Sequence, residues 1–140
     1  MKTILAVDDD NSILDVLRDV LVARGYEVLT ASSVDEALDI LRQQRRLDLV
    51  LLDLNMPGQN GFALYKELDS SHPIPVLFVS GFSQSFSPST EGFTNIWTNG
   101  FTQGMTDILY KPFSISLLYE KVEALIGDSG LVENEETQRP

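Results

Sequence analysis

The fold of this chain can be inferred from Leu49-Val50-Leu51-Leu52-Asp53-Leu54-Asn55-Met56-Pro57-Gly58. Four successive apolar residues bounded by turn-forming residues are typical of a strand that is buried on both faces. Asp53 then closes this strand at the edge of a parallel sheet where open α/β folds bind their ligands. Because the quoted stretch contains no basic residue to neutralise Asp53, the partners of this carboxylate must come from elsewhere in the chain.

Length and composition indicate one globular domain. The chain has 140 residues, of which 43% are hydrophobic, and a mean hydropathy of −0.02. A formal net charge of −11 argues against direct binding to nucleic acid or an anionic membrane, and suits basic protein surfaces or cations. The absence of cysteine excludes disulfides, zinc thiolates and thiol nucleophiles. There is no signal-peptide pattern, and no apolar run approaches the roughly 18–20 residues of a membrane span, so we expect a cytoplasmic protein.

Strand and helix patterns alternate along the chain. Short apolar runs predict five strands, at Ile4–Val7, Glu27–Thr30, Leu49–Leu52, Val76–Val79 and Asp107–Tyr110. Apolar residues at helical spacing predict helices that begin after Asp10 or Asn11, after Ser33, at Asn60-Gly61 and after Ser114. Ser33 and Glu36 have the spacing of a capping box. The inner face of the last helix is expected to carry Leu117, Leu118, Val122, Leu125 and Ile126. The alternation predicts an α/β fold with a doubly wound, five-stranded parallel sheet.

Two segments depart from this alternation. Between Gly81 and Thr106 the sequence is rich in Ser, Thr, Asn, Gln and Gly, with interspersed aromatic residues, and we expect no regular full-length helix there. The aromatic residues are interpreted either as core or as a partner-binding surface. Residues 128–140 are acidic and end in Pro, which predicts a flexible tail beyond a domain of residues 1–127.

Four of the predicted strands end in polar residues at what would be one edge of the sheet, at Asp8-Asp9, Asp53, Ser80 and Lys111. If the first and third strands are neighbours, three carboxylates converge, and two such charges 4 Å apart repel by roughly 4 kcal/mol at an effective dielectric constant near 20. A cation among them would relieve this repulsion, and ligands that are all oxygen suit Mg²⁺. A carboxylate nucleophile with a divalent cation, a lysine and a hydroxyl is suited to phosphoryl transfer onto Asp53.

These motifs resemble those of bacterial response regulator receiver domains over residues 3–127. The residues that carry the resemblance are Asp8-Asp9, Asp53 in LLDLNMPG, Ser80 in VLFVSG and Lys111 in YKPF. The resemblance implies a flavodoxin-like sheet with strand order 2-1-3-4-5 and a cytoplasmic phosphoprotein of two-component signalling. It implies that Asp53 accepts phosphate from a sensor histidine kinase or a histidine phosphotransfer protein, and that a downstream protein partner receives the signal. It also implies that Asp8, Asp9, Asp53 and the backbone carbonyl of Asn55 hold Mg²⁺, while Ser80 and Lys111 bind the phosphoryl group.

The sequence departs from the family pattern in two places. Ile108 stands three residues before the lysine, where such domains usually carry Tyr or Phe as half of a coupled switch. Tyr110 shares the strand face of Ile108 by alternation and is the substitute that the sequence offers. The stretch between Ser80 and Lys111 is longer than the family norm, so we expect an atypical connection between the fourth and fifth strands.

Other interpretations stay open for these residues and for the chain. Asp8 to Asp10 can be a solvated helix N-terminus, Ser80 a loop residue, Lys111 a surface lysine and His72 a solvated loop residue. A pseudo-receiver, acting as a phosphorylation-independent interaction module, is the alternative function. A small Mg²⁺-dependent phosphatase ranks last, because Asn55 stands where its second acid–base carboxylate is needed. We therefore expect no enzymatic activity beyond Mg²⁺-dependent self-phosphorylation and autodephosphorylation.

Overall fold

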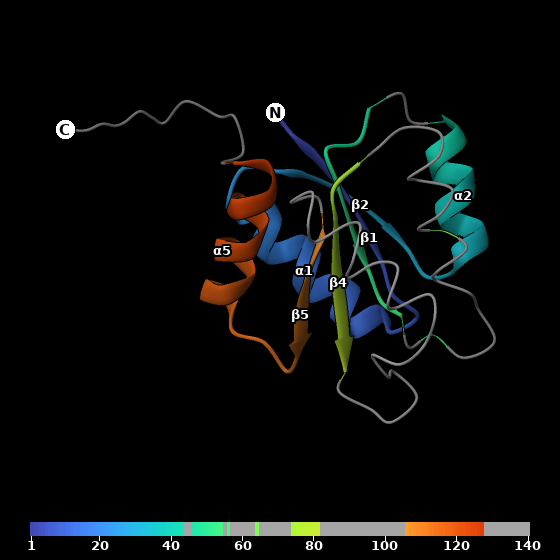
Figure 1. The fold of residues 1–140 in the computed structure, drawn as a ribbon. Coiled ribbons are helices and arrows are strands. Elements are labelled where there is room, and N and C mark those ends of the chain that lie inside the picture. The colour runs from blue at the N-terminus through green and yellow to red at the C-terminus, as the bar shows by residue number, and fades with distance from the viewer. Residues whose placement is uncertain (44–45, 55, 57–63, 65–73, 82–105, 128–140) are drawn as a thin grey trace.

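The computed structural model describes residues 1–43, 46–54, 56, 64, 74–81 and 106–127. Its elements are β1 (Thr3–Val7), α1 (Asn11–Ala23), β2 (Glu27–Ala31), α2 (Val34–Gln43), β3 (Leu49–Leu52), β4 (Val76–Gly81), β5 (Thr106–Lys111) and α5 (Ile115–Ile126). The five strands form one parallel sheet in the order β2-β1-β3-β4-β5 (Figure 1). The prediction of a doubly wound α/β sheet with flavodoxin-like strand order is confirmed.

Three predictions fall wholly or largely outside the described residues. The connection between β4 and β5 is one, although Gly81 and Thr106, placed in that connection by the sequence pattern, belong to the two strands. The tail of residues 128–140 is another. The third is the helix expected from Asn60-Gly61, of which only Leu64 is described, with its side chain buried.

The register of the central strands aligns their carboxyl ends. Every residue of β1 and β3 is buried, as their apolar runs predict. Val7 pairs with Leu52, so the residues that follow the two strands come level with each other. The N–H of Asp53 continues the ladder by donating to the carbonyl of Val7 at 3.0 Å, and the N–H of Asp8 donates to Ala31 at 3.1 Å. Backbone hydrogen bonding thus places Asp8 and Asp53 side by side at one edge of the sheet.

The core has two parts, one on each face of the sheet. On one face α1 and α5 cover the strands with buried residues, namely Leu14, Leu17, Leu21, Leu118 and Val122. On the other face α2 covers them through Ala37, beside Phe78 and Ile108 of the strands. Each fully buried leucine or phenylalanine contributes roughly 1.5–3 kcal/mol to folding relative to an exposed one. This packing fixes α1, which follows Asp8 and Asp9, against the strands. Within the described part of the chain no helix is both long and apolar enough to cross a membrane.

The helix N-termini follow the predicted caps with one difference. Asp10 caps α1 and Ser114 caps α5, each through its side chain. Ser33 accepts from the N–H of Glu36 at 3.0 Å, which is half of the predicted capping box. The carboxylate of Glu36, however, accepts from the N–H and the hydroxyl of Ser32, at 2.7 and 3.1 Å. The second half of the capping box therefore involves Ser32, one residue before Ser33, because Ser32 offers two donors to one carboxylate oxygen of Glu36.

The prediction that Leu117 lies on the inner face of α5 is wrong, because its side chain is exposed. Leu117 lies just outside the buried stripe of α5, at 38% exposed, whereas its neighbour Leu118 is fully buried. Leu118 and Val122, four residues apart, take the buried positions. Leu125 and Ile126 pack against the same core, as predicted.

Candidate functional site

Two carboxylates are buried where β1 and β3 end. Asp8 is 2% exposed and Asp53 is 3% exposed. Both follow buried strands whose register is fixed by backbone hydrogen bonds, so the backbone holds both residues at this edge of the sheet. Buried carboxylates are costly unless they are paired or hydrogen-bonded. Their position therefore requires partners from neighbouring elements.

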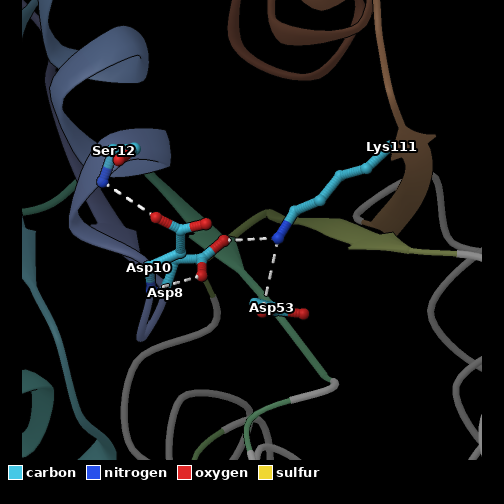
Figure 2. A network of polar contacts seen from close by, with 5 residues as sticks. All are labelled: Asp8, Asp10, Ser12, Asp53 and Lys111. Carbon is cyan, nitrogen blue, oxygen red and sulfur yellow. Dashed lines mark hydrogen bonds and ion pairs between the residues drawn. The ribbon is translucent and has the colours of Figure 1, made fainter.

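Lys111 supplies the positive charge, as the sequence predicts. It is the last residue of β5, and its peptide bond to Pro112 is cis. Its ammonium group donates to Oδ2 of Asp8 at 2.7 Å and to Oδ2 of Asp53 at 3.4 Å (Figure 2). With 21% of its side chain exposed, Lys111 reaches from the edge strand across the carboxyl ends of the sheet. The shorter bond shows that its main partner here is Asp8.

Burial and ionic contacts have opposite effects on the pKa values of Asp8 and Lys111. Burial raises the pKa of Asp8, and the hydrogen bonds from Lys111 and from the N–H of Asp10 offset this rise only in part. The charge of Asp53 adds to the rise. Burial by itself lowers the pKa of Lys111, but its hydrogen bond to Asp8 and the charges of both carboxylates raise it above the ordinary value. Lys111 is therefore held charged, while ionised Asp8 stands to gain from a further cation.

Asp9 joins the two buried carboxylates from the solvent side. Its side chain is exposed, and ligand atoms of Asp8, Asp9 and Asp53 all lie within 4.8 Å of one another. The three residues come from the ends of two adjacent strands. The structure thus brings together four residues predicted from the sequence, namely Asp8, Asp9, Asp53 and Lys111.

Two other predicted site residues are placed only in part. Ser80 lies on β4 and its backbone pairs in register with Tyr110, which puts it at the same edge of the sheet. Its side chain lies outside what the structure describes. Asn55 also lies outside the described residues, so its predicted role as a metal ligand stays a prediction.

Asp10 has a role at the site that the sequence pattern did not suggest. Beyond its predicted cap, its backbone N–H donates to Oδ1 of Asp8 at 2.9 Å, and its own carboxylate accepts from the N–H of Ser12 at 2.9 Å (Figure 2). Aspartate side chains commonly accept from the backbone two residues on. An Asp two residues before a helix cap is therefore the sequence signal for this contact.

On β5, Ile108 and Tyr110 differ sharply in burial. Ile108 pairs in register with Phe78 and is 7% exposed within the core on the α2 side of the sheet. Tyr110 is 45% exposed. An aliphatic side chain thus fills the place where the resemblance leads one to expect an aromatic residue.

The family of the response regulator receiver domain matches residues 4–123 of this chain. Among curated proteins, the chain is 36% identical over 121 residues to the uncharacterized transcriptional regulatory protein YrkP of Bacillus subtilis (strain 168), covering 86% of this chain and 48% of that protein. It is 31% identical over 126 residues to the transcriptional regulatory protein CpxR of Escherichia coli (strain K12), covering 90% of this chain and 50% of that protein. The chain spans about half the length of these relatives.

A solved structure has the same architecture. The crystal structure of a response regulator receiver protein from Burkholderia phymatum superposes with a TM-score of 0.73 at 29% identity. The match covers 94% of this chain and 100% of that one.

Proposed function

The chain belongs to the response regulator receiver domain family, and from this premise we propose that Asp53 accepts a phosphoryl group in the presence of Mg²⁺. The observation that carries the proposal is the buried Asp53 carboxylate at the end of β3, beside a charged lysine and a pair of further carboxylates. A nucleophile in phosphoryl transfer needs positive charge nearby to offset the charge of the incoming group. Lys111 provides part of it.

The donor set fits a hard divalent cation. Asp8, Asp9 and Asp53 offer only oxygen atoms, and their ligand atoms lie within 4.8 Å of one another. The raised pKa of Asp8, caused first by burial, indicates a carboxylate whose charge is not fully compensated by Lys111. When bound, Mg²⁺ would supply charge neutralisation and orient a phosphoryl oxygen. Asp9, which is exposed, would hold the ion from the solvent side.

The residues of this chain would act as follows. The Asp53 carboxylate oxygen forms the new P–O bond while the P–N bond of a phosphohistidine donor breaks. The donor imidazole leaves with the bonding electron pair and takes up a proton. Lys111 lies 3.4 Å from Asp53, so its ammonium can transfer its hydrogen bond from Asp8 to the phosphoryl oxygens. Asp8 keeps its bond from the N–H of Asp10 during this exchange.

We propose a sensor histidine kinase or histidine phosphotransfer protein as the donor, and a protein partner as the receiver of the signal. The supporting facts are membership of the family and the net charge of −11, which suits a basic protein surface rather than nucleic acid. We propose that the chemistry of this chain is limited to self-phosphorylation and autodephosphorylation.

A specific observation favours a second candidate. Ile108 is buried against the core instead of an aromatic residue that could move, which supports a pseudo-receiver whose surface ignores phosphate. The two candidates differ either in phosphorylation itself or in the change of the surface that follows it. A pseudo-receiver either is not phosphorylated or does not change its surface when it is.

The test is the intact mass of the protein after incubation with acetyl phosphate and Mg²⁺. We expect one added phosphoryl mass in the wild type, and none when EDTA replaces Mg²⁺ or when Asp53→Ala is used. Full labelling of Asp53→Ala would assign the acceptor elsewhere. An unlabelled but folded wild type would favour the pseudo-receiver.

A further inference from the structure

Asp10 connects Asp8 to α1 through three separate groups. Its N–H donates to Oδ1 of Asp8, and its carboxylate accepts from the N–H of Ser12, both at 2.9 Å (Figure 2). Its carbonyl accepts from the N–H groups of Ile13 and Leu14, both at 3.1 Å. The first turn of α1 and the carboxylate of Asp8 are therefore connected through one residue.

This connection fixes Asp8 on the side away from Lys111. Oδ1 of Asp8 is held by Asp10, and Oδ2 is held by Lys111 at 2.7 Å. The helix that Asp10 caps is itself fixed to the sheet through Leu14 and other buried residues. If the first turn of α1 frays, the N–H of Asp10 loses its position, and the Asp8 carboxylate becomes free to rotate.

We propose that Asp10 is a positioning residue for the metal site, holding Asp8 in place by capping α1. The inference rests on the proposed function, since it concerns the Mg²⁺ site. Asp10 does not belong to the group of ligand atoms formed by Asp8, Asp9 and Asp53, and its carboxylate is bonded to Ser12 instead. It acts through Asp8 rather than as a ligand.

The competing explanation is that Asp10 affects Mg²⁺ binding only through its negative charge. Asp10→Asn separates the two, because Asn caps helices as well as Asp but is neutral. Asp10→Ser also caps and is neutral, whereas Asp10→Ala neither caps nor carries charge. Ser33→Ala is the matched control, since it removes the cap of another helix. The hydroxyl of Ser33 caps α2 by accepting from the N–H of Glu36 at 3.0 Å.

The experiment measures the Mg²⁺ dissociation constant of each full-length variant by NMR titration with MgCl₂, at 0.15 M and 1 M KCl. At 1 M salt the Debye length is about 3 Å, so the through-space effect of one exposed charge is largely screened. We expect Asp10→Ala to weaken binding by a factor of about 3 to 10 at both salt concentrations, the equivalent of a lost N-cap. Asp10→Asn, Asp10→Ser and Ser33→Ala should match the wild type at 1 M salt.

A second readout follows the contact itself. Exchange of the residue 10 amide with solvent should be slow in the wild type, Asp10→Asn and Asp10→Ser, and faster in Asp10→Ala. If Asp10→Ala does not fold, Asp10→Gln takes its place in both measurements. Gln carries the same amide as Asn, but on a longer side chain that does not cap.

Equal weakening by Asn and Ala at 1 M salt would overturn the proposal, as would weakening by Ser33→Ala or no effect of Asp10→Ala. A wild type that does not bind Mg²⁺ would instead contradict the proposed function. The two failures are thus distinguishable.

Discussion

Lys111→Met should destabilise the metal-free protein by about 3 kcal/mol at pH 7. At an effective dielectric constant near 20, the attraction of the ammonium is about 6 kcal/mol for Asp8 at 2.7 Å and about 5 kcal/mol for Asp53 at 3.4 Å. Burial of the ammonium offsets much of this, and removal of one partner from a buried pair typically costs about 3–5 kcal/mol. Because the Lys111 side chain is 21% exposed, water can enter in its place, and we expect the lower end of that range.

The destabilisation should shrink as the pH falls. The pKa of Asp8 is already raised by burial, and loss of Lys111 raises it further above its value in the unfolded chain. A carboxyl group whose pKa is raised on folding costs stability once the pH exceeds that folded-state pKa, and this cost disappears on protonation. The variant therefore regains stability, relative to the wild type, as the pH falls through the pKa of Asp8.

The assay is urea unfolding in EDTA at a series of pH values from 5 to 8. Lys121→Met is the matched control, since it breaks a lysine–carboxylate pair at 3.2 Å whose partner, Asp107, is about one-third exposed. Such a partly exposed pair contributes about 0–1 kcal/mol to the free energy of unfolding. A Lys111→Met loss no larger than that of the control would refute the reasoning, and so would a loss that grows toward low pH.

Three further predictions follow from the same site. Asp8→Asn should raise the free energy of unfolding in EDTA at pH 7, because it removes a charge whose pKa is raised by burial and leaves Lys111 with Asp53 as a partner; urea unfolding checks this, and a loss of stability would contradict it. Asp9→Ala should abolish Mg²⁺ binding in an NMR titration, because Asp9 is the solvent-side ligand; an unchanged isotherm would remove the metal site. Beryllofluoride, a phosphoryl mimic, should change hydrogen exchange most between Gly81 and Asp107, the segment that follows Ser80 in sequence; identical exchange with and without it would favour the pseudo-receiver.

The strands could be predicted from the sequence because their burial is encoded locally. Apart from Thr3 at the start of β1, the residues of β1 and β3 are apolar on both faces, and only the centre of a covered sheet accommodates them. Their alternation with helices then fixed which edge carries Asp8 and Asp53. The end of the predicted fifth strand placed Lys111 at the same edge. In the structure β5 extends to include Lys111 as its last residue.

Other features depend on tertiary geometry that no local pattern carries. Lys111 bonds Asp8 more closely than Asp53, a preference set by where the edge strand ends relative to β1 and β3. The exposure of Leu117 depends on the rotation of α5 against the sheet, since its neighbour Leu118 has the same hydrophobicity.

The central claim is that the phosphoryl group resides on Asp53, and the most direct measurement is its position in the chain. After reaction with acetyl phosphate and Mg²⁺, borohydride reduces an aspartyl phosphate to homoserine, and peptide mass spectrometry then locates the changed residue. We predict that the change occurs at position 53 and that it disappears when EDTA replaces Mg²⁺. Reduction at Asp8, Asp9 or any other aspartate, with position 53 intact, would contradict the account.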